Sequence, residues 1–340
     1  MDLACQADHG KQCVAPEIAG CTPLGFETVG LACYRVTAPL RRVFVPATPY
    51  AAELEDLMSR IAYVNGRYQP WRDATVHIED RGYQFSDGVY EVCEVTGGRM
   101  VDERRHMARL ERSLGELRIA MPMAPAALAV VMRETIRRNR VINGIVYLQV
   151  TRGVARRDHA FPPAGTAPAV VVTARAIAPA GNEAMAEKGV AVVTVPDNRW
   201  GRVDIKSVAL LPNVLAKQTA REQGAREAWF VDRDGKVTEG SSSNAWIVTA
   251  DGRVLTRAAD SAILKGITRD VLIGVISTQG LTFEERSFTV AEALAAREAF
   301  LSSASQIVMP IVQIDGKAVG DGRPGPVARA LRQAFHRHAE

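Results

Sequence analysis

Alternation of apolar and polar residues is clearest over residues 88–96, Gly-Val-Tyr-Glu-Val-Cys-Glu-Val-Thr. A period of two predicts a β-strand that places Tyr90 and Val92 on one face and Glu91 and Cys93 on the other. Two glycines follow and predict a tight turn. This stretch is therefore expected to be a half-buried strand of an antiparallel sheet.

Shorter patterns along the chain predict the remaining elements. Runs rich in β-branched residues predict strands at residues 61–64, 67–69, 74–78, 144–152, 169–175 and 190–195. Apolar stripes at helical spacing, with proline and glycine punctuation, predict helices at residues 106–117, 124–138, 212–223, 267–276, 290–296 and 327–336. Mixed helices and hairpin-linked strands favour an α+β fold of two domains over one doubly wound parallel sheet.

The pattern also suggests where domains begin and end. Residues 1–57 contain five prolines and no periodicity, so they are expected to be a poorly ordered N-terminal extension, with Met58 as an alternative start. Small residues at 178–188 predict an interdomain linker. The linker separates a small N-terminal α/β domain at 58–177 from a large C-terminal domain at 189–340.

Composition narrows the class of protein. The 340 residues are 47% hydrophobic and 24% charged, which is typical of a globular protein with two cores. A net charge of +4 without a block of basic residues favours a small anionic substrate over nucleic acid. No membrane-length apolar run and no signal peptide are evident, so a cytoplasmic location is expected.

The cysteines do not predict a metal site or a disulfide framework. Four of the five lie in the first 57 residues, and none is spaced as Cys-x-x-Cys or matched by histidines. We therefore expect no metal.

Lysine is scarce, and this draws attention to Lys206. Only seven of the 42 basic residues are lysine, and Lys206 lies in the run Asp-Ile-Lys-Ser. A primary amine can lose its proton and condense with a carbonyl to form a Schiff base, which arginine cannot do. On composition alone, a solvated loop lysine is the alternative.

Three further groups could carry chemistry. Glu239 is predicted at a strand end before a glycine and three serines, where a solvated hairpin residue is the alternative. The sequence Gly266-Ile267-Thr268 opens a predicted helix, and free amides at a helix start bind phosphate. Arg109 could grip the same phosphate, although an ordinary surface arginine fits its position equally well.

Arg157 and His159 lie two residues apart and would point the same way in an extended segment. Two convergent donors of this kind form a carboxylate trap. A solvated basic loop is the alternative.

Five motifs occur in order, and together they carry a resemblance to a known family. They are Arg-Gly-Tyr-Gln-Phe-Ser-Asp-Gly-Val-Tyr-Glu-Val at 81–92, His-x-x-Arg-Leu at 106–110, Asp-Ile-Lys-Ser at 204–207, Glu-Gly-Ser-Ser-Ser-Asn at 239–244 and Leu-Lys-Gly-Ile-Thr-Arg at 264–269. The chain resembles the fold-type IV pyridoxal-phosphate aminotransferases, most closely the D-amino-acid (D-alanine) branch. The resemblance runs from about residue 61 to the last predicted helix.

The resemblance implies a pyridoxal 5'-phosphate cofactor and a set of residues that bind it in the large domain. Lys206 is similar to the lysine that carries the cofactor as an internal aldimine, and Glu239 to the carboxylate that faces the pyridine nitrogen. Leu264 is similar to the residue that packs on the ring. The remaining cofactor contacts that the resemblance implies are Arg109, Ser242, Gly266, Ile267, Thr268 and Ser303.

For the substrate, the resemblance implies that Tyr90, Arg157 and His159 bind the α-carboxylate and that Val92 lines the side-chain pocket. Two choices stay open: Arg156 competes with Arg157, and any hydroxyl of residues 302–305 could reach the phosphate.

The activity implied is ping-pong transamination between a D-amino acid and a 2-oxo acid by a homodimer. On the same fold, an (R)-amine transaminase, a branched-chain aminotransferase or an aminodeoxychorismate lyase remains an alternative. A catalytically idle cofactor-binding protein is a further alternative, which Lys206 and Glu239 together disfavour.

Overall fold

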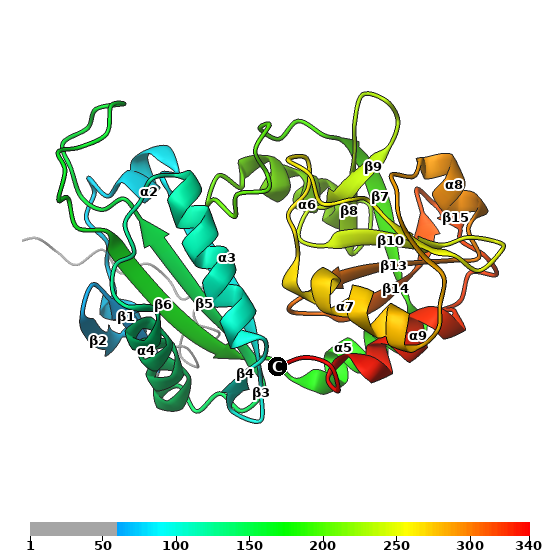
Figure 1. The fold of residues 1–340 in the computed structure, drawn as a ribbon, viewed down its shortest axis with the longest axis horizontal. Coiled ribbons are helices and arrows are strands. Elements are labelled where there is room, and N and C mark those ends of the chain that lie inside the picture. Colours follow the sequence, from blue (N-terminus) through cyan, green and yellow to red (C-terminus); the bar gives the residue numbers. More distant parts are fainter. Residues whose placement is uncertain (1–59) are drawn as a thin grey trace, which may run out of the picture. The chain divides into compact units, whose positions relative to one another are not determined.

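The computed structural model describes residues 60–340, which form two β-sheets with helices packed on them (Figure 1). The predicted extension at 1–57 and the alternative start at Met58 lie outside the described residues. Within residues 60–340, no helix has the length and apolar character needed to cross a membrane. Helices and strands alternate with many antiparallel hairpins, so the prediction of an α+β fold is confirmed.

The first sheet is antiparallel and has the strand order β2-β1-β6-β5-β3-β4. Its strands are β1 (Ile61–Val64), β2 (Arg67–Pro70), β3 (Gly88–Thr96), β4 (Arg99–Met100), β5 (Gly144–Thr151) and β6 (Ala169–Ala176). The alternation predicted for β3 is confirmed, because Val89 and Cys93 are completely buried whereas Tyr90 and Val92 are half-buried. Tyr90 and Val92 are therefore on the face of β3 that remains open to a ligand.

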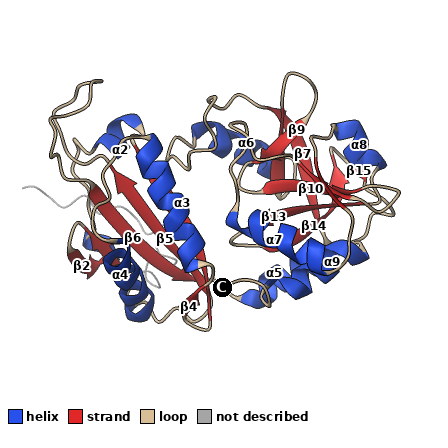
Figure 2. Ribbon diagram, viewed as in Figure 1, coloured by secondary structure: helices blue, strands red, loops and turns tan. Residues whose placement is uncertain are grey.

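Two helices cover the buried face of this sheet, α3 (Glu103–Glu116) and α4 (Pro125–Arg138). Figure 2 shows both helices lying beside the strands, with α3 running in nearly the same direction as β5 and β6. Leu110 and Met132 are completely buried in the shared core with the inward side chains of β3, β5 and β6. Two short helices, η1 (Trp71–Asp73) and α2 (Arg81–Phe85), precede β3.

The strand predicted at residues 74–78 is wrong. This segment is irregular and pairs with no strand, and Val76 and Ile78 are 47% and 76% exposed. Its local bonds include those from the amides of Glu79 and Asp80 to His77. An alternating pattern predicts a strand only where a neighbouring strand supplies the hydrogen bonds, and here none does.

The segment predicted as an interdomain linker forms a helix, α5 (Pro179–Lys188). It starts with a proline at the first helical position and ends at Gly189, which has a positive φ of 74°. The chain passes here from β6 of the first sheet to the second sheet. The proposed division into domains at 177 and 189 stays a prediction.

The second sheet is mixed and has the strand order β12-β11-β10-β13-β14-β7-β8-β9, with β15 paired to β14. Its strands are β7 (Val190–Pro196), β8 (Glu227–Val231), β9 (Val237–Gly240), β10 (Asn244–Val248), β11 (Val254–Thr256), β12 (Phe283–Glu285), β13 (Glu298–Ser303), β14 (Ile307–Ile314) and β15 (Lys317–Ala318). Every residue of β10 is buried because separate apolar cores cover its two faces, one containing Ile247 and the other Trp246. This explains a continuous apolar run without alternation.

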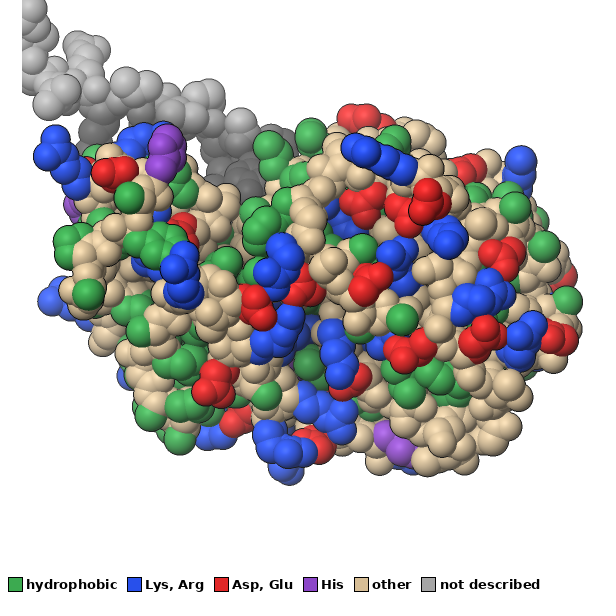
Figure 3. All heavy atoms as spheres, turned by 45° about the horizontal axis from the view of Figure 1, so that its top comes forward, with side chains coloured by type: hydrophobic (Ala, Val, Ile, Leu, Met, Phe, Trp, Pro, Cys, Tyr) green, Lys and Arg blue, Asp and Glu red, His purple; other side chains and the backbone are tan. Residues whose placement is uncertain are grey.

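Besides α5, four helices pack on the second sheet: α6 (Leu211–Glu222), α7 (Ile267–Thr278), α8 (Val290–Ala295) and α9 (Pro326–Phe335). Leu272 of α7 and Leu331 of α9 are completely buried in the core on one face, and Ala293 of α8 is buried in the core on the other. The helices predicted in this part of the chain are confirmed. On the face shown in Figure 3, basic and acidic side chains are interspersed rather than separated.

The loop between β7 and α6 connects the second sheet to the first. The Tyr90 amide donates to the Lys206 carbonyl at 3.0 Å, and the Val208 amide donates to the Gly88 carbonyl at 3.0 Å. Arg112 of α3 donates to the Asp204 carboxylate at 2.6 Å and to its carbonyl at 2.9 Å. These bonds fix the backbone of Lys206 against the start of β3.

Candidate active site

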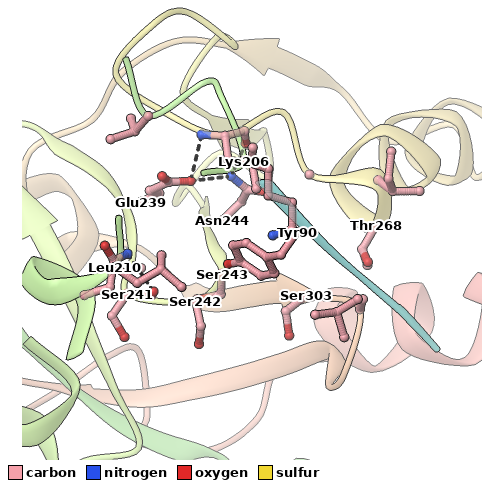
Figure 4. Close-up of a pocket in the computed structure, with 18 of the residues that line it drawn as sticks. Tyr90, Lys206, Leu210, Glu239, Ser241, Ser242, Ser243, Asn244, Thr268 and Ser303 are labelled. Atoms are coloured by element: carbon pink, nitrogen blue, oxygen red, sulfur yellow. Dashed lines mark hydrogen bonds between the residues drawn. The ribbon is translucent and has the colours of Figure 1, made fainter. Parts of the chain in front are cut away.

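A cavity of about 210 Å³ lies where four parts of the chain meet. They are the face of β3 that carries Tyr90 and Val92, the loop at 199–210, the β9–β10 turn and the start of α7. Its lining includes eleven of the thirteen residues that the sequence predicts for the site: Tyr90, Val92, Arg109, Lys206, Glu239, Ser242, Leu264, Gly266, Ile267, Thr268 and Ser303. Segments that are far apart in the sequence are thus brought to one pocket (Figure 4).

The amine of Lys206 lies over the ring of Tyr90, with Nζ 4.1 Å from the ring centroid. Its backbone is held by β3, so the flexible part is the side chain alone. Among residues 60–340, no carboxylate lies within ion-pair distance of this amine. The backbone of Lys206 is therefore fixed, while its amine is free to react with a ligand.

The carboxylate of Glu239 is buried at another side of the pocket, at the end of β9. It accepts hydrogen bonds from the Asn244 side chain and from the Leu264 amide, both at 3.1 Å, and it pairs with Arg199. Burial raises the pKa of the Glu239 carboxyl to about 7, and Arg199 and the Leu264 amide act in the opposite direction. Because burial and these contacts oppose each other, the Glu239 carboxyl can accept or share a proton with a ligand.

The start of α7 provides donors on the opposite side of the pocket from Glu239, where Figure 4 places Thr268 and Ser303. No side chain caps this helix, so the first amides after Gly266 are free to bind a ligand. The hydroxyl of Ser303 is buried and has no hydrogen-bond partner, whereas the Ser302 hydroxyl accepts a bond from Trp246 at 2.9 Å. Free amides and an unpartnered hydroxyl are the donors that an anion requires.

Arg109 is held beside these donors by a buried carboxylate. Its guanidinium donates to both oxygens of Glu91 at 2.8 and 2.7 Å and to the Lys265 carbonyl at 3.0 Å. His106 also contacts Glu91, at 2.7 Å. Burial acts to raise the pKa of Glu91, but Arg109 and His106 outweigh it and lower the pKa to about 2. Glu91 is thus ionised and fixes the direction of the Arg109 fork.

The three serines of the β9–β10 turn surround a second buried carboxylate. Ser241, Ser242 and Ser243 all donate to Glu227, which is completely buried, and Lys217 lies 3.1 Å from it. The Ser242 hydroxyl, predicted to bind cofactor, is therefore engaged with Glu227 at 2.8 Å.

Arg157 and His159 are the two predicted site residues that do not line the pocket. They lie on the exposed loop between β5 and β6, which extends beyond α2 in Figure 1. Arg157 packs on the ring of Phe85 at 4.7 Å, and the His159 ring lies 5.5 Å from the same ring. Their role in binding a carboxylate therefore stays a prediction.

Sequence reasoning missed several residues that shape the pocket. Glu91 carried a signal, because it is a charged residue on the buried face of β3 between Val89 and Cys93. Asn244 ends the Glu-Gly-Ser-Ser-Ser-Asn motif and could have been included with it. Arg199 lies in a loop, and nothing in its local sequence indicates that it reaches Glu239.

Comparison with known proteins now identifies the family. A model described as amino-transferase class IV matches residues 88–314, which includes most of the pocket residues. The chain belongs to the class IV aminotransferases. It is therefore an aminotransferase, and it uses pyridoxal 5'-phosphate (PLP), the cofactor of this family.

Curated relatives match this class IV aminotransferase over nearly their whole length. The D-alanine aminotransferase of Staphylococcus haemolyticus is 39% identical over 278 residues, covering 82% of this chain and 97% of the relative. That of Listeria monocytogenes serotype 4b (strain F2365) is 41% identical over 273 residues, covering 80% and 93%. The resemblance deduced from the five motifs is confirmed.

Solved structures agree with the predicted fold-type IV architecture. The branched-chain amino acid aminotransferase from Escherichia coli superposes with a TM-score of 0.73 at 26% identity, covering 82% of this chain and 93% of that one. The branched-chain aminotransferase from the archaeon Thermoproteus uzoniensis, solved with norvaline, gives a TM-score of 0.71 at 26% identity, covering 82% and 94%.

The pocket fits PLP on its own chemistry. The cofactor needs donors for a phosphate, a carboxylate for a ring nitrogen and an amine for an aldehyde. The unpartnered Ser303 hydroxyl and the uncapped start of α7 supply the first, Glu239 the second and Lys206 the third. These groups come from separate sides of one cavity, as the length of such a molecule requires.

Proposed function

We propose that this aminotransferase transfers an amino group between a D-amino acid of the alanine type and a 2-oxo acid of the 2-oxoglutarate type. The proposal is carried by one observation: a single pocket contains the Lys206 amine, the Glu239 carboxylate and the uncapped start of α7. The names of the 39–41% identical relatives support the choice of D-amino acids.

Each side chain has a defined task in this proposal. Ile267 and Thr268 offer amides to the phosphate, while Arg109 and the Ser303 hydroxyl add further donors. Leu264, which lines the pocket, would pack against the ring of the cofactor. Glu239 would face the ring nitrogen as a carboxylate, and Arg199 and the Leu264 amide favour this ionised form against the effect of burial.

Proton transfer is assigned to Lys206. When bound, PLP supplies a ring that accepts the electron pair left behind when a proton is removed from the substrate Cα. The Lys206 amine takes that proton and later returns it, because its backbone is fixed by β3 while its side chain can move. Tyr90, 4.1 Å from the amine, is positioned to contact the substrate beside it, and Val92 lines the same wall.

A branched-chain substrate is the second candidate, because the solved neighbours with TM-scores of 0.73 and 0.71 carry that name. The two are separated by following the visible absorption band of the PLP-loaded enzyme while D-alanine, L-leucine and (R)-1-phenylethylamine are added in turn. Loss of the band with D-alanine alone supports the proposal, and loss with L-leucine alone rejects it. Release of pyruvate from aminodeoxychorismate without an amino acceptor would indicate the lyase instead.

The role of Lys206 is tested by substitution. Lys206→Ala should abolish turnover, because no other amine lines the pocket within residues 60–340. Lys317→Ala, on the exposed strand β15, serves as a control and should leave turnover unchanged. Full activity of Lys206→Ala would reject the assignment.

We propose further that the enzyme acts as a homodimer in which Arg157 and His159 bind the α-carboxylate in the partner subunit's pocket. The support is their position: both are exposed, and neither lines the pocket of its own chain. Mixing inactive Lys206→Ala with impaired Arg157→Ala tests this. If the loop acts on the partner, reassorted dimers recover about a quarter of wild-type activity, since half are mixed and each mixed dimer has one complete site. No recovery on subunit exchange would place the trap in the same chain.

A further inference from the structure

The loop that carries Arg157 and His159 is exposed, yet it is attached to the protein by a buried arginine. Arg81, whose side chain is 4% exposed, donates from Nη1 to the Asp158 carbonyl at 2.6 Å and from Nη2 to the His159 carbonyl at 3.5 Å. These bonds grip the backbone of the residues next to and within the predicted trap.

A single carboxylate, Asp87, holds Arg81 together with a second buried arginine, Arg152. Asp87 accepts from Nε of Arg81 at 2.8 Å and from Nε and Nη2 of Arg152 at 2.7 and 2.9 Å. Arg152 also donates to the carbonyls of Leu117 and Arg118 at the end of α3. Burial acts to raise the pKa of Asp87, but the two arginines outweigh it and lower the pKa, so the carboxylate is ionised.

Aromatic rings complete the attachment. The Phe85 ring lies beneath Arg157, 4.7 Å away, and 5.5 Å from the His159 ring. The guanidinium carbons of Arg118 and Arg152 lie 4.6 and 3.8 Å from the centroid of the Phe161 ring. The loop is thus fixed at both ends of the segment that contains the two predicted substrate ligands.

Burying two guanidinium groups has a high desolvation cost, which is offset only when all their hydrogen bonds are satisfied. Here the bonds of Arg81 end on the loop backbone, while the side chains of Arg157 and His159 make no hydrogen bond within residues 60–340. Asp87 also directly precedes β3, the strand that carries Tyr90. One cluster therefore holds the loop that carries Arg157 and His159 and lies next to the start of the strand that carries Tyr90.

We infer that Arg81 and Asp87 are positioning residues, which hold Arg157 and His159 in the arrangement that binds the α-carboxylate of the amino acid and of the 2-oxo acid. The inference rests on the proposed function. It predicts that weakening the cluster affects substrate binding more than chemistry or cofactor binding.

Arg81→Lys tests this in the PLP-loaded enzyme, because lysine keeps the charge beside Asp87 but lacks the fork that reaches both carbonyls. KM for D-alanine and for 2-oxoglutarate should rise about tenfold, as expected when hydrogen bonds that fix a ligand are lost. The kcat should stay within about twofold, and PLP affinity should not change. An unchanged KM would overturn the inference.

Arg332→Lys is the matched control. Arg332 is similarly buried, at 9% exposed, pairs with a carboxylate and donates to two backbone carbonyls, those of Gln306 and Val308, but it is remote from the loop. It should leave the KM of both substrates unchanged. An equal rise in KM in this variant would indicate general loosening of the fold and would overturn the inference.

A double-mutant cycle with Arg157→Ala separates positioning from an independent effect. If Arg81 acts through Arg157 and His159, adding Arg81→Lys to Arg157→Ala raises KM by much less than it does in the wild type. Full multiplication of the two effects would reject the inference while leaving the proposed function intact. An unchanged KM in Arg157→Ala itself would instead reject the proposed carboxylate trap, and the inference with it.

A gentler variant covers the case in which Arg81→Lys does not fold. Phe85→Leu keeps an apolar side chain but removes the ring beneath Arg157, and it should raise KM several-fold with normal kcat. Hydrogen exchange provides a readout without turnover: the Ala160 amide, which donates to Asp158 Oδ1 at 3.1 Å, should exchange faster in either variant than in the wild type. Unchanged KM and unchanged exchange in Phe85→Leu would overturn the inference.

Discussion

The carboxylate of Glu91 offers the sharpest test of how the first sheet supports the cofactor pocket. Glu91→Gln keeps the size of the side chain but removes the charge that orients Arg109 and His106. The pKa of Glu91 falls from 4.5 to about 2 on folding. Since each pKa unit corresponds to about 1.36 kcal/mol, the ionised group stabilises the folded chain by about 3 kcal/mol at pH 7.

The sign of the pH dependence follows from the lowered pKa. This stabilisation is fully present above pH 4.5 and is lost as the pH falls through about 2. Urea unfolding of the cofactor-free proteins should therefore show Glu91→Gln about 3 kcal/mol less stable at pH 7, with a gap about 1 kcal/mol smaller near pH 3.5. The variant should also bind PLP more weakly, because the Arg109 fork is no longer fixed.

A matched surface control exists in α4. Glu134 accepts from Arg137 and Arg138, and these bonds lower its pKa to about 2 as well, but its side chain is 25% exposed and the two arginines are 72% and 40% exposed. Glu134→Gln should therefore change stability little, because exposed ion pairs contribute little. Equal losses in the two variants, or a Glu91→Gln gap that does not depend on pH, would refute the argument that burial makes this carboxylate important.

Three further predictions concern the cofactor end of the pocket. Ser303→Ala removes an unpartnered buried hydroxyl, so urea unfolding of the cofactor-free protein should show no loss of stability. Titration with PLP should show that its affinity falls several-fold. An unchanged PLP affinity would contradict the assignment. A Cβ at Gly266 would overlap Oδ1 of Asn244, so Gly266→Ala should lower PLP affinity at least about tenfold, whereas Gly274→Ala, with open space around it in the same helix, should not. Glu239→Gln should reduce kcat about 100-fold or more in steady-state assays while the protein still binds PLP; a kcat near wild type would show that the charge is not needed.

Local sequence patterns predicted the helices, whose backbone hydrogen bonds are internal, and the strands that bury one face. The alternation at 88–96 and the apolar stripe at 106–117 were sufficient, because each pattern matches a single regular period. The same reasoning failed at 74–78, where the β-like residues have no neighbouring strand. It also assigned the small residues at 178–188 to an interdomain linker, although a proline at the start and a glycine at the end are compatible with a helix.

Predictions for the site succeeded where the residue type itself indicates chemistry. A rare lysine, a glycine-opened helix and a glutamate before serines all line the pocket. The supporting contacts were not predictable, because the pairing of Arg199 with Glu239 and that of Arg109 with Glu91 join residues 40 and 18 positions apart. No local period encodes such distances.

The position of Lys206 ties these results together. Its loop leaves the second sheet after β7, bonds to β3 of the first sheet and returns to α6, so the reactive amine stands where both sheets contribute to one cavity. The first sheet supplies Tyr90 and the Glu91-held Arg109, and the second supplies Glu239 and the start of α7. A loop fixed only to its own sheet would leave the amine free to drift from Tyr90, whereas the Tyr90 amide bond to the Lys206 carbonyl prevents that directly. This explains why the lysine that mattered lies in an irregular segment: the requirement is a backbone shared by two sheets, with a side chain that remains free.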